Sequence, residues 1–423
     1  MADSTPTPDS TPTPRTFYGI LVAGLVYRVF YLLELSRLPD WSRLIGDEAY
    51  FMDQARHFGE PGPCEPFHMS PLFIVGLSSF RRLFGENPLC WRLFLIACGA
   101  LSAVLLAATA GRLLGAALAP LALGLYLFCG PLIYYESNLD LCPLASTTTV
   151  AALYFAVRWQ HEDRARDYLL AGLCVGVGIL ARPNAALLCG ALFLGPLFLR
   201  PGRPWPRRLA LAVAAPLLAL LCTIPVSLHN RRCDPDPVWV TDSGGLNLYI
   251  GNHRGANGTF NIPDHIPGAI NVATQQAAFQ AAAARALGQP RVSPARASAY
   301  WSRAAIKEIQ ADPGAWLRLM ARKVALVFNA QDLSNTRSYE FRSELCVTLG
   351  PWLVQVGYLA PLALIGLFLG IARPRQDFFV VLFTLAFTAA LSLFFVLGHY
   401  RQVLLPLFIL LALRTGQTLW SLR

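Results

Sequence analysis

The chain has 423 residues, of which 55% are hydrophobic and only 14% are charged, and its formal net charge is +10. A soluble globular domain carries nearer to a quarter charged residues, so one water-soluble core cannot hide this much apolar surface. The basic residues lie mostly between apolar runs, which indicates orientation in a membrane and excludes nucleic acid as the partner. The composition therefore predicts an all-α polytopic membrane protein.

The first 16 residues contain DSTPTP twice in tandem, and this Pro/Ser/Thr-rich segment is predicted to be a disordered tail. It lacks the basic segment and the cleavage site of a signal peptide. The first apolar run is therefore expected to stay in the protein as an uncleaved anchor.

Apolar runs account for most of the remaining chain, and about ten of them are candidates to cross a bilayer, which needs roughly 20 residues per helix. The fifth and sixth are short, and they could form a tight pair of thin spans or a re-entrant hairpin. Gly172, Gly176 and Gly178 in the fifth run are interpreted as small residues for close helix packing. The runs are residues 17–35, 89–110, 116–135, 141–157, 168–181, 185–199, 209–228, 347–371, 378–397 and 403–420.

Arginines between the runs favour a cytoplasmic N-terminus by the positive-inside bias. The exception is the segment 36–88, where several arginines lie outside but are mixed with acids. This topology divides the chain into the tail 1–16, an N-terminal transmembrane module 17–228 with a first external loop 36–88, an external loop 229–346, and C-terminal transmembrane helices 347–423.

Helices too short to span are predicted in both external loops, and those at 47–58, 71–84 and 313–328 are expected to lie along the membrane interface. In the first loop they cover 47–58 and 71–84. In the second loop they cover 273–287, 294–310 and 313–328, and Asp312-Pro313 is a start signal for the last of these.

Asp47 and Glu48 follow the first run in LIGDEAYFMDQA. A carboxylate held near the membrane surface can act as a general base on an acceptor hydroxyl or amine. The simpler interpretation is that two acids in the first turn of a helix are stabilised by its dipole.

Further polar residues fall on the same external side. Glu136 and Asp140 lie between the third and fourth runs, Arg182 interrupts an apolar region, and His399, Tyr400 and Arg401 form part of LGHYRQVLLP. Arginines at lipid level suit a phosphate, although they also serve as interfacial anchors. A carboxylate and arginines on one face together suit a lipid-tethered phosphate substrate, with the arginines stabilising the phosphate as a leaving group.

The chain resembles the GT-C membrane glycosyltransferases, specifically the family-39-like group of protein O-mannosyltransferases and the aminoarabinose transferase of lipid A. The matching stretches are GDEAY at 46–50, SPLFIVGLSSFRRLFG at 70–85, ARPNAALL at 181–188, GGLNLYIGNHRGANG at 244–258 and HYRQVLLP at 399–406. The resemblance implies a GT-C helix bundle in which 17–228 is the catalytic module. It also implies a polyprenyl-phosphate sugar donor and inverting transfer on the periplasmic or lumenal side, with Asp47 as base and Glu48 as its neighbour. Asp140 occupies the region of the family's second acidic position, for which Glu136 competes.

The function expected from these features is glycosyl transfer to an acceptor that is a lipid, a glycan or a protein, in a bacterial inner membrane with the active site facing the periplasm. No cofactor and no metal site is assigned, and divalent metal dependence is left open. The alternative is a lipid or lipid-linked sugar transporter or flippase. Against it, the acids lie at the ends of the runs, and the runs show no internal repeat.

Three cysteines, Cys64, Cys233 and Cys346, are expected outside the membrane. In an oxidising compartment Cys233 and Cys346 could pair and tie the ends of the second external loop, or all three could remain thiols.

Overall fold

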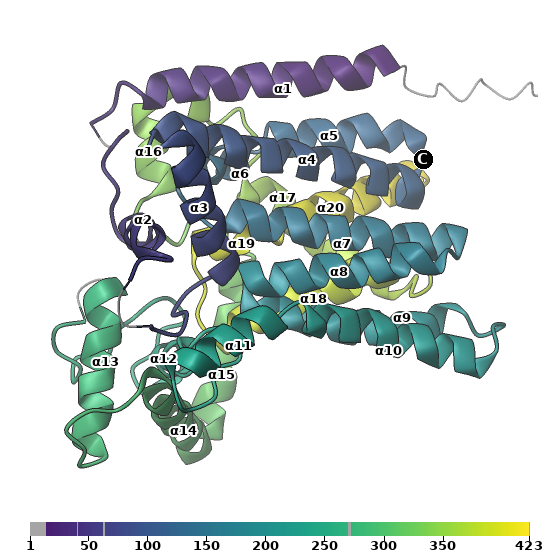
Figure 1. Cartoon of the computed structure of the whole chain (residues 1–423). Helices are drawn as coiled ribbons and strands as arrows, with labels where there is room; N and C mark the ends of the chain where they lie inside the picture. The colour runs from purple at the N-terminus through teal and green to yellow at the C-terminus, as the bar shows by residue number, and fades with distance from the viewer. Residues whose placement is uncertain (1–13, 40, 62–63, 270–271, 335, 423) are drawn as a thin grey trace, which may run out of the picture.

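The computed structural model describes the whole chain except residues 1–13, 40, 62–63, 270–271, 335 and 423. Within this described part the chain forms helices and no strand, and the helices lie side by side in a bundle (Figure 1). The prediction of an all-α polytopic membrane protein is confirmed. Most of the predicted tail falls outside the described residues, but 14–16 belong to the first helix.

Every predicted apolar run contains helix. The helices formed by the runs are α1 (Pro14–Leu35), α4 (Pro88–Leu114), α5 (Ala119–Leu127) with α6 (Gly130–Glu136), α7 (Cys142–Glu162), α8 (Ala165–Ala181), η2 (Pro183–Leu187) with α9 (Leu188–Leu199), α10 (Trp205–Leu221) with α11 (Ile224–Cys233), α17 (Val356–Ile371), α18 (Phe378–Leu393) and α20 (Leu405–Trp420). Among the described residues, three stretches are long and apolar enough to cross a membrane by length and composition: Pro14–Leu35, Pro88–Leu114 and Trp205–Cys233. The other apolar helices are shorter or interrupted.

The interruptions have local causes. The helix of the third run breaks after Leu127, and there Val354 N donates to Phe128 O (2.9 Å) while Gly130 N donates to Val354 O (3.0 Å). The backbone groups released by the break are thus satisfied inside the protein, as a membrane environment requires. The run predicted at 347–371 begins with the short η3 (Val347–Leu349), and α17 starts only at Val356. Gly350 and Pro351 end that first turn, because proline cannot continue a helix.

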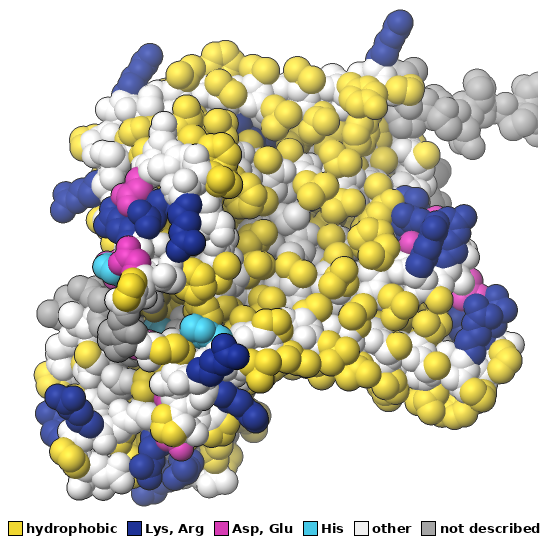
Figure 2. Space-filling model, viewed as in Figure 1, with side chains coloured by type: hydrophobic (Ala, Val, Ile, Leu, Met, Phe, Trp, Pro, Cys, Tyr) yellow, Lys and Arg dark blue, Asp and Glu magenta, His cyan; other side chains and the backbone are white. Residues whose placement is uncertain are grey.

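The outer surface of the bundle is apolar between two charged ends (Figure 2). On α1, large hydrophobic side chains such as Val22, Val29, Phe30 and Leu33 are more than half exposed. A continuous apolar surface of this kind is stable in lipid but not in water. The surface therefore agrees with an integral membrane protein.

The fifth run, α8, packs closely against α10. A Cβ placed on Gly172 would lie 2.4 Å from Ala215 O, and one on Gly176 would lie 2.8 Å from Ala219 O. These contacts leave room only for hydrogen, so the interpretation of these glycines as packing residues is confirmed. Helix α8 also packs against α7, so it is held between α7 and α10.

The remaining helices gather at one end of the bundle (Figure 1). They are α2 (Asp47–His57), α3 (Pro71–Phe84), α12 (Gly244–Asn252), α13 (Val272–Ala286), α14 (Pro294–Ala311), α15 (Pro313–Val327), α16 (Tyr339–Leu345) and α19 (Gly398–Arg401). The predicted start of α15 is confirmed, because Asp312 Oδ1 accepts a hydrogen bond from Ala315 N (2.8 Å). The external loops thus form a helical cap over the bundle end.

The disulfide in this cap matches neither of the alternatives predicted from the sequence, a Cys233–Cys346 pair or three free thiols. Cys233 pairs with Cys64, with their Cα atoms 4.8 Å apart, so the pairing with Cys346 is wrong. The bond joins the end of α11 to the first external loop, and not the two ends of the second loop. Sequence spacing cannot reveal this partner, because disulfide geometry depends on the folded positions of both residues.

We expect alkylation under denaturing conditions to label the peptides of Cys64 and Cys233 only after reduction, whereas the peptide of Cys346 is labelled in either case. Peptide mass spectrometry measures this directly. Replacing Cys346 with serine should leave the reductant-dependent labelling unchanged, and replacing Cys64 should free Cys233. Labelling of Cys64 without reductant would contradict the assigned bond.

Candidate active site

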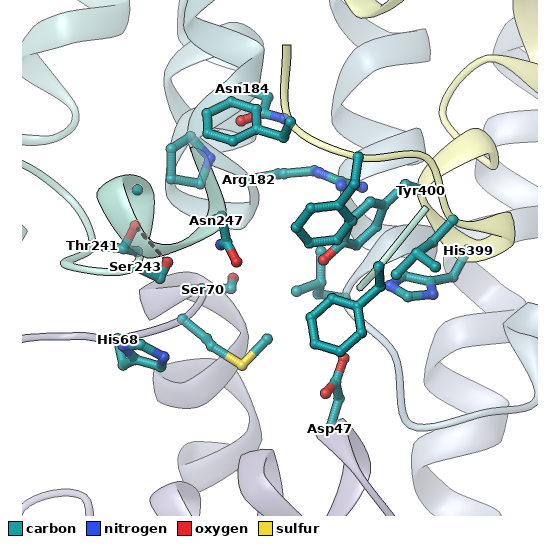
Figure 3. A pocket seen from close by; sticks show the side chains of 18 of the residues that line it. Asp47, His68, Ser70, Arg182, Asn184, Thr241, Ser243, Asn247, His399 and Tyr400 are labelled. Atoms are coloured by element: carbon teal, nitrogen blue, oxygen red, sulfur yellow. Dashed lines mark hydrogen bonds between the residues drawn. The ribbon is translucent and has the colours of Figure 1, made fainter. Parts of the chain in front are cut away.

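A pocket of about 190 Å³ opens at the junction between the bundle and the cap (Figure 3). Its polar and charged lining comes from α2, the segments before α3 and α7, the residue after α8, η2, α12 and the segment leading into it, α13, and α19. These residues are Asp47, His68, Ser70, Asp140, Arg182, Asn184, Thr241, Ser243, Asn247, Gln275, His399 and Tyr400, and phenylalanines such as Phe260, Phe394 and Phe395 complete the wall. The pocket thus collects side chains from both halves of the chain.

Asp47 enters the pocket from the first residue of α2. The preceding Gly46 has φ +58°, and a Cβ there would lie 2.5 Å from Thr336 Oγ1, so this turn requires glycine. Protein surrounds Asp47 on most sides. This burial, followed by the negative charges of Asp140 and Glu48, raises the pKa of Asp47 to about 7, while His68 opposes the rise. A carboxylate with a pKa near neutral pH is suited to accept a proton in catalysis.

Asp140, Arg182 and Tyr400 converge from three different elements. Asp140 Oδ1 accepts a hydrogen bond from Cys142 N (2.7 Å) at the start of α7. The Arg182 guanidinium lies 3.7 Å from the centre of the Tyr400 ring, a cation–π contact that holds it in place. Arg182 is only 8% exposed, so its charge acts in a largely desolvated site. It is the one Arg or Lys among the described residues that line this pocket.

His399 also lines the pocket and packs edge-on against Tyr400, with 4.2 Å between the ring centres. Burial lowers the pKa of His399 to about 4, and the charge of Arg182 acts in the same direction. The imidazole of His399 is therefore neutral at neutral pH. It can donate or accept one hydrogen bond but adds no positive charge to the pocket.

Three of the predicted site residues lie elsewhere. Glu48 Oε2 accepts a hydrogen bond from Arg337 Nη2 (2.7 Å), and Glu48 Oε1 accepts one from Leu139 N (3.3 Å). Glu136 pairs with the buried Arg28 at 2.7 Å. Both acids thus join segments that are distant in sequence.

Arg401 is the third of these residues, and it is 2% exposed. Its guanidinium donates to Asn329 O and Gln331 O, each at 2.5 Å, and lies 3.6 Å from Asp332. These contacts anchor the segment before α16. The neighbours of Arg401 in the chain, His399 and Tyr400, are the members of HYR that line the pocket.

Several lining residues were not predicted from the sequence. They include His68, Ser70, Asn184, Thr241, Ser243 and Asn247, which Figure 3 shows around the pocket with Asp47, Arg182 and Tyr400. Three of them lie in stretches already singled out: Ser70 opens the stretch at 70–85, Asn184 belongs to ARPNAALL, and Asn247 belongs to GGLNLYIGNHRGANG. Neutral hydroxyl and amide side chains of this kind can hydrogen-bond a polyhydroxylated ligand.

Comparison with known proteins gives one sequence match and several fold matches. Residues 68–229 match the family model described as dolichyl-phosphate-mannose-protein mannosyltransferase. No curated protein sequence matches the chain.

Among solved structures, the fold is similar to that of the archaeal oligosaccharyltransferase AglB from Archaeoglobus fulgidus. In complex with an inhibitory peptide and a dolichol-phosphate, that protein aligns at 12% identity and a TM-score of 0.53, over 96% of this chain and 50% of its own. In its complex with Zn and sulfate it aligns at 13% identity and a TM-score of 0.55, over 95% of this chain and 49% of its own. ArnT from Cupriavidus metallidurans bound to undecaprenyl phosphate aligns at 16% identity and a TM-score of 0.45, over 97% of this chain and 79% of its own.

The chain spans about half the length of the AglB chains that it matches, with the shared part covering nearly all of this chain. At these identities the AglB structures show the fold, while the sequence match comes from residues 68–229, which include His68, Asp140 and Arg182 of the pocket. Over residues 68–229 the chain is thus similar to the dolichyl-phosphate-mannose-protein mannosyltransferases, and its fold is similar to that of the AglB structures.

Proposed function

We propose that this chain transfers a sugar from a polyprenyl-phosphate-linked donor to an acceptor on the external side of a bacterial inner membrane. The observation that carries the proposal is that Asp47 and Arg182 line one pocket at the loop end of the helix bundle. The description of the matching family model names a dolichyl-phosphate sugar, and AglB has been solved with a dolichol-phosphate, which supports a polyprenyl phosphate as the donor's carrier.

The proposed reaction is a single displacement with inversion at the sugar carbon. The acceptor oxygen or nitrogen forms a bond to the anomeric carbon while the bond between that carbon and the phosphate oxygen breaks. Asp47 takes the proton of the acceptor, and the polyprenyl phosphate leaves with the electron pair of the broken bond. Arg182 stabilises the charge that develops on this phosphate, because an arginine in a desolvated site interacts strongly with an anion.

Asp140, His399 and Tyr400 have supporting roles in this scheme. Tyr400 holds the guanidinium of Arg182, and Asp140 raises the pKa of Asp47. His399 contributes a neutral hydrogen-bonding group on the same wall. Glu48, Glu136 and Arg401 stabilise the surrounding segments and are not proposed to touch the substrate.

The external orientation is testable by labelling single cysteines in a variant that retains only the Cys64–Cys233 disulfide. We expect a membrane-impermeant maleimide to label position 257 in intact cells, and to label positions 164 and 207 only after permeabilisation. All three residues are exposed, so accessibility in the fold does not limit labelling. Labelling of 257 only in permeabilised cells would put the pocket on the cytoplasmic side and overturn the proposed orientation.

The function itself is tested with purified protein in lipid nanodiscs and a panel of undecaprenyl-phosphate-linked hexoses and pentoses. The measurement is release of undecaprenyl phosphate, with cell-envelope extract as the acceptor source and with or without a divalent cation. We expect release with at least one donor, and loss of release in Asp47→Asn. Transport of intact donor into proteoliposome interiors without release would favour a flippase.

A further inference from the structure

The wall of the pocket opposite Arg182 contains a buried histidine–aspartate pair that the mechanism above does not use. His68 Nδ1 and Asp242 Oδ1 are in direct contact, and their residues are 7% and 5% exposed. Because Nδ1 faces Asp242, Nε2 is the ring nitrogen left for the pocket, which His68 lines together with Asp47 (Figure 3). No hydrogen bond to this Nε2 occurs within the described part of the chain.

Several contacts hold this pair in position. Asp242 N donates to Phe67 O (3.0 Å), and Asn230 links the same two segments by accepting from Phe67 N (3.1 Å) and donating to Val240 O (3.1 Å). The Cys64–Cys233 disulfide joins the two segments again, close to these hydrogen bonds. The chain thus uses a covalent bond and a buried asparagine to keep His68 against Asp242. A histidine packed for shape alone would not need this arrangement.

The charged groups around Asp47 and His68 determine how the histidine–aspartate pair can act on Asp47. Titratable and charged groups surround Asp47 in the pocket and in the smaller cavity beside it. They are Glu48, His68, Tyr134, Tyr135, Asp140, Arg182, Arg337, His399 and Tyr400. His68 itself faces Asp242, Asp47 and Tyr50, whose ring centre is 6.2 Å from that of His68. The contact between His68 and Asp242 has the geometry of an ion pair, in which the imidazole carries the positive charge. His399 forms no ion pair with an acid in the described part of the chain, and burial lowers its pKa to about 4, although Asp140 opposes this.

We propose that His68, held by Asp242, is a positioning residue that supplies a positive charge to the acidic side of the pocket and thereby keeps Asp47 ionised. The inference rests on the proposed role of Asp47 as the base. It adds the group that increases the deprotonated fraction of this base at neutral pH. Burial and the neighbouring acids Asp140 and Glu48 raise the pKa of Asp47, and the charge of His68 lowers it. Asp47 must be deprotonated to accept a proton, so loss of the positive charge should leave a larger fraction of the base protonated at neutral pH and lower turnover there.

The test is a pH titration of Asp47 by infrared spectroscopy on the full chain in nanodiscs, which needs no substrate. The protonated carboxyl band that disappears in Asp47→Asn identifies the residue. In the unaltered protein we expect this band to titrate with a midpoint near 7. In His68→Gln we expect the midpoint to rise by about one pH unit, the lower end of the effect of an opposite charge nearby.

In the single variant His68→Gln, Asp242 is left as a buried charge without its partner, which can misfold the protein. A double variant removes this problem. His68→Gln with Asp242→Asn replaces the ion pair with two amides that can hydrogen-bond each other, and it should raise the midpoint in the same direction. The matched control is His57→Gln, because His57 forms an exposed pair with Asp53 at 3.6 Å on the same helix as Asp47. This control should leave the midpoint unchanged.

Turnover gives a second readout. Activity that requires ionised Asp47 rises with pH through its pKa, so the rising limb should move to higher pH in His68→Gln, with activity approaching that of the unaltered protein at high pH. Unmoved infrared midpoints in both His68 variants would overturn the inference. If the midpoints move but Asp47→Asn retains turnover, the electrostatic pairing stands and the proposed base is wrong, so the two failures are distinguishable.

Discussion

Asp47→Asn is expected to reduce turnover by at least about a hundredfold, the lower end of typical general-base contributions, while donor binding changes little. Asparagine preserves the shape and hydrogen bonding of the side chain but cannot accept the proton of the acceptor. Protein level in the membrane should be normal, because the turn that positions Asp47 depends on Gly46 and not on the carboxylate. The measurement is release of undecaprenyl phosphate, together with donor affinity determined separately.

Glu48→Gln is the matched control, because it changes the neighbouring acid in the same way. Glu48 contacts Arg337 and Leu139 and does not line the 190 Å³ pocket, so its loss should lower thermal stability more than turnover. Losing one partner of a largely buried ion pair is destabilising even where the pair itself contributes little. Full turnover in Asp47→Asn beside an inactive but folded Glu48→Gln would reverse the assignment of the base.

Arg182→Ala is expected to weaken donor binding and slow transfer by about tenfold to a hundredfold. This corresponds to about 1.5–3 kcal/mol for a lost hydrogen bond to a charged group. The affinity for undecaprenyl phosphate in nanodiscs measures the effect without a sugar or an acceptor. Arg182→Lys should restore it only in part, because lysine lacks the planar fork that binds two phosphate oxygens and stacks on Tyr400.

Arg401→Ala is the control for Arg182→Ala. It shows whether removal of any arginine near the pocket weakens undecaprenyl phosphate binding. Arg401 holds the segment 329–332 through two backbone carbonyls and Asp332, and so its removal should lower the melting temperature. Where the variant remains folded, undecaprenyl phosphate affinity should be close to normal. Loss of affinity in Arg401→Ala with normal binding in Arg182→Ala would move the phosphate site to the other arginine.

The sequence predicts the helices and their approximate ends. It also predicts that five pocket residues lie on one side of the membrane: Asp47, Asp140, Arg182, His399 and Tyr400. The reason is that these features depend on local composition. Apolar runs of this length must be helical in lipid, because every backbone group has to be satisfied within the segment. Residues at the ends of consecutive spans then alternate between the two sides, so a polar residue at a known span end has a known side.

The direction of each side chain was not predictable in the same way, because it depends on partners far away in the chain. Asp47 and Glu48 are neighbours, yet a rotation of about 100° per residue turns one into the pocket and the other towards Arg337. Glu136 forms an ion pair with Arg28 on α1, and Arg401 donates hydrogen bonds to the backbone before α16. In each case a buried charge is stable only beside a partner, because burying an unpaired charge is costly. The partner comes into contact only when the helices pack together.

The same reason explains the residues that the sequence did not reveal. His68 and Asp242 are 174 positions apart, and Cys64 and Cys233 are 169 apart. Neither pair has a local pattern, because their contact forms only when the first external loop folds onto the segment after α11. A lone histidine in CEPFHMSPL carries no signal of its own. Its proposed electrostatic role comes from a carboxylate behind it and Asp47 across the pocket, an arrangement that exists only in the folded chain.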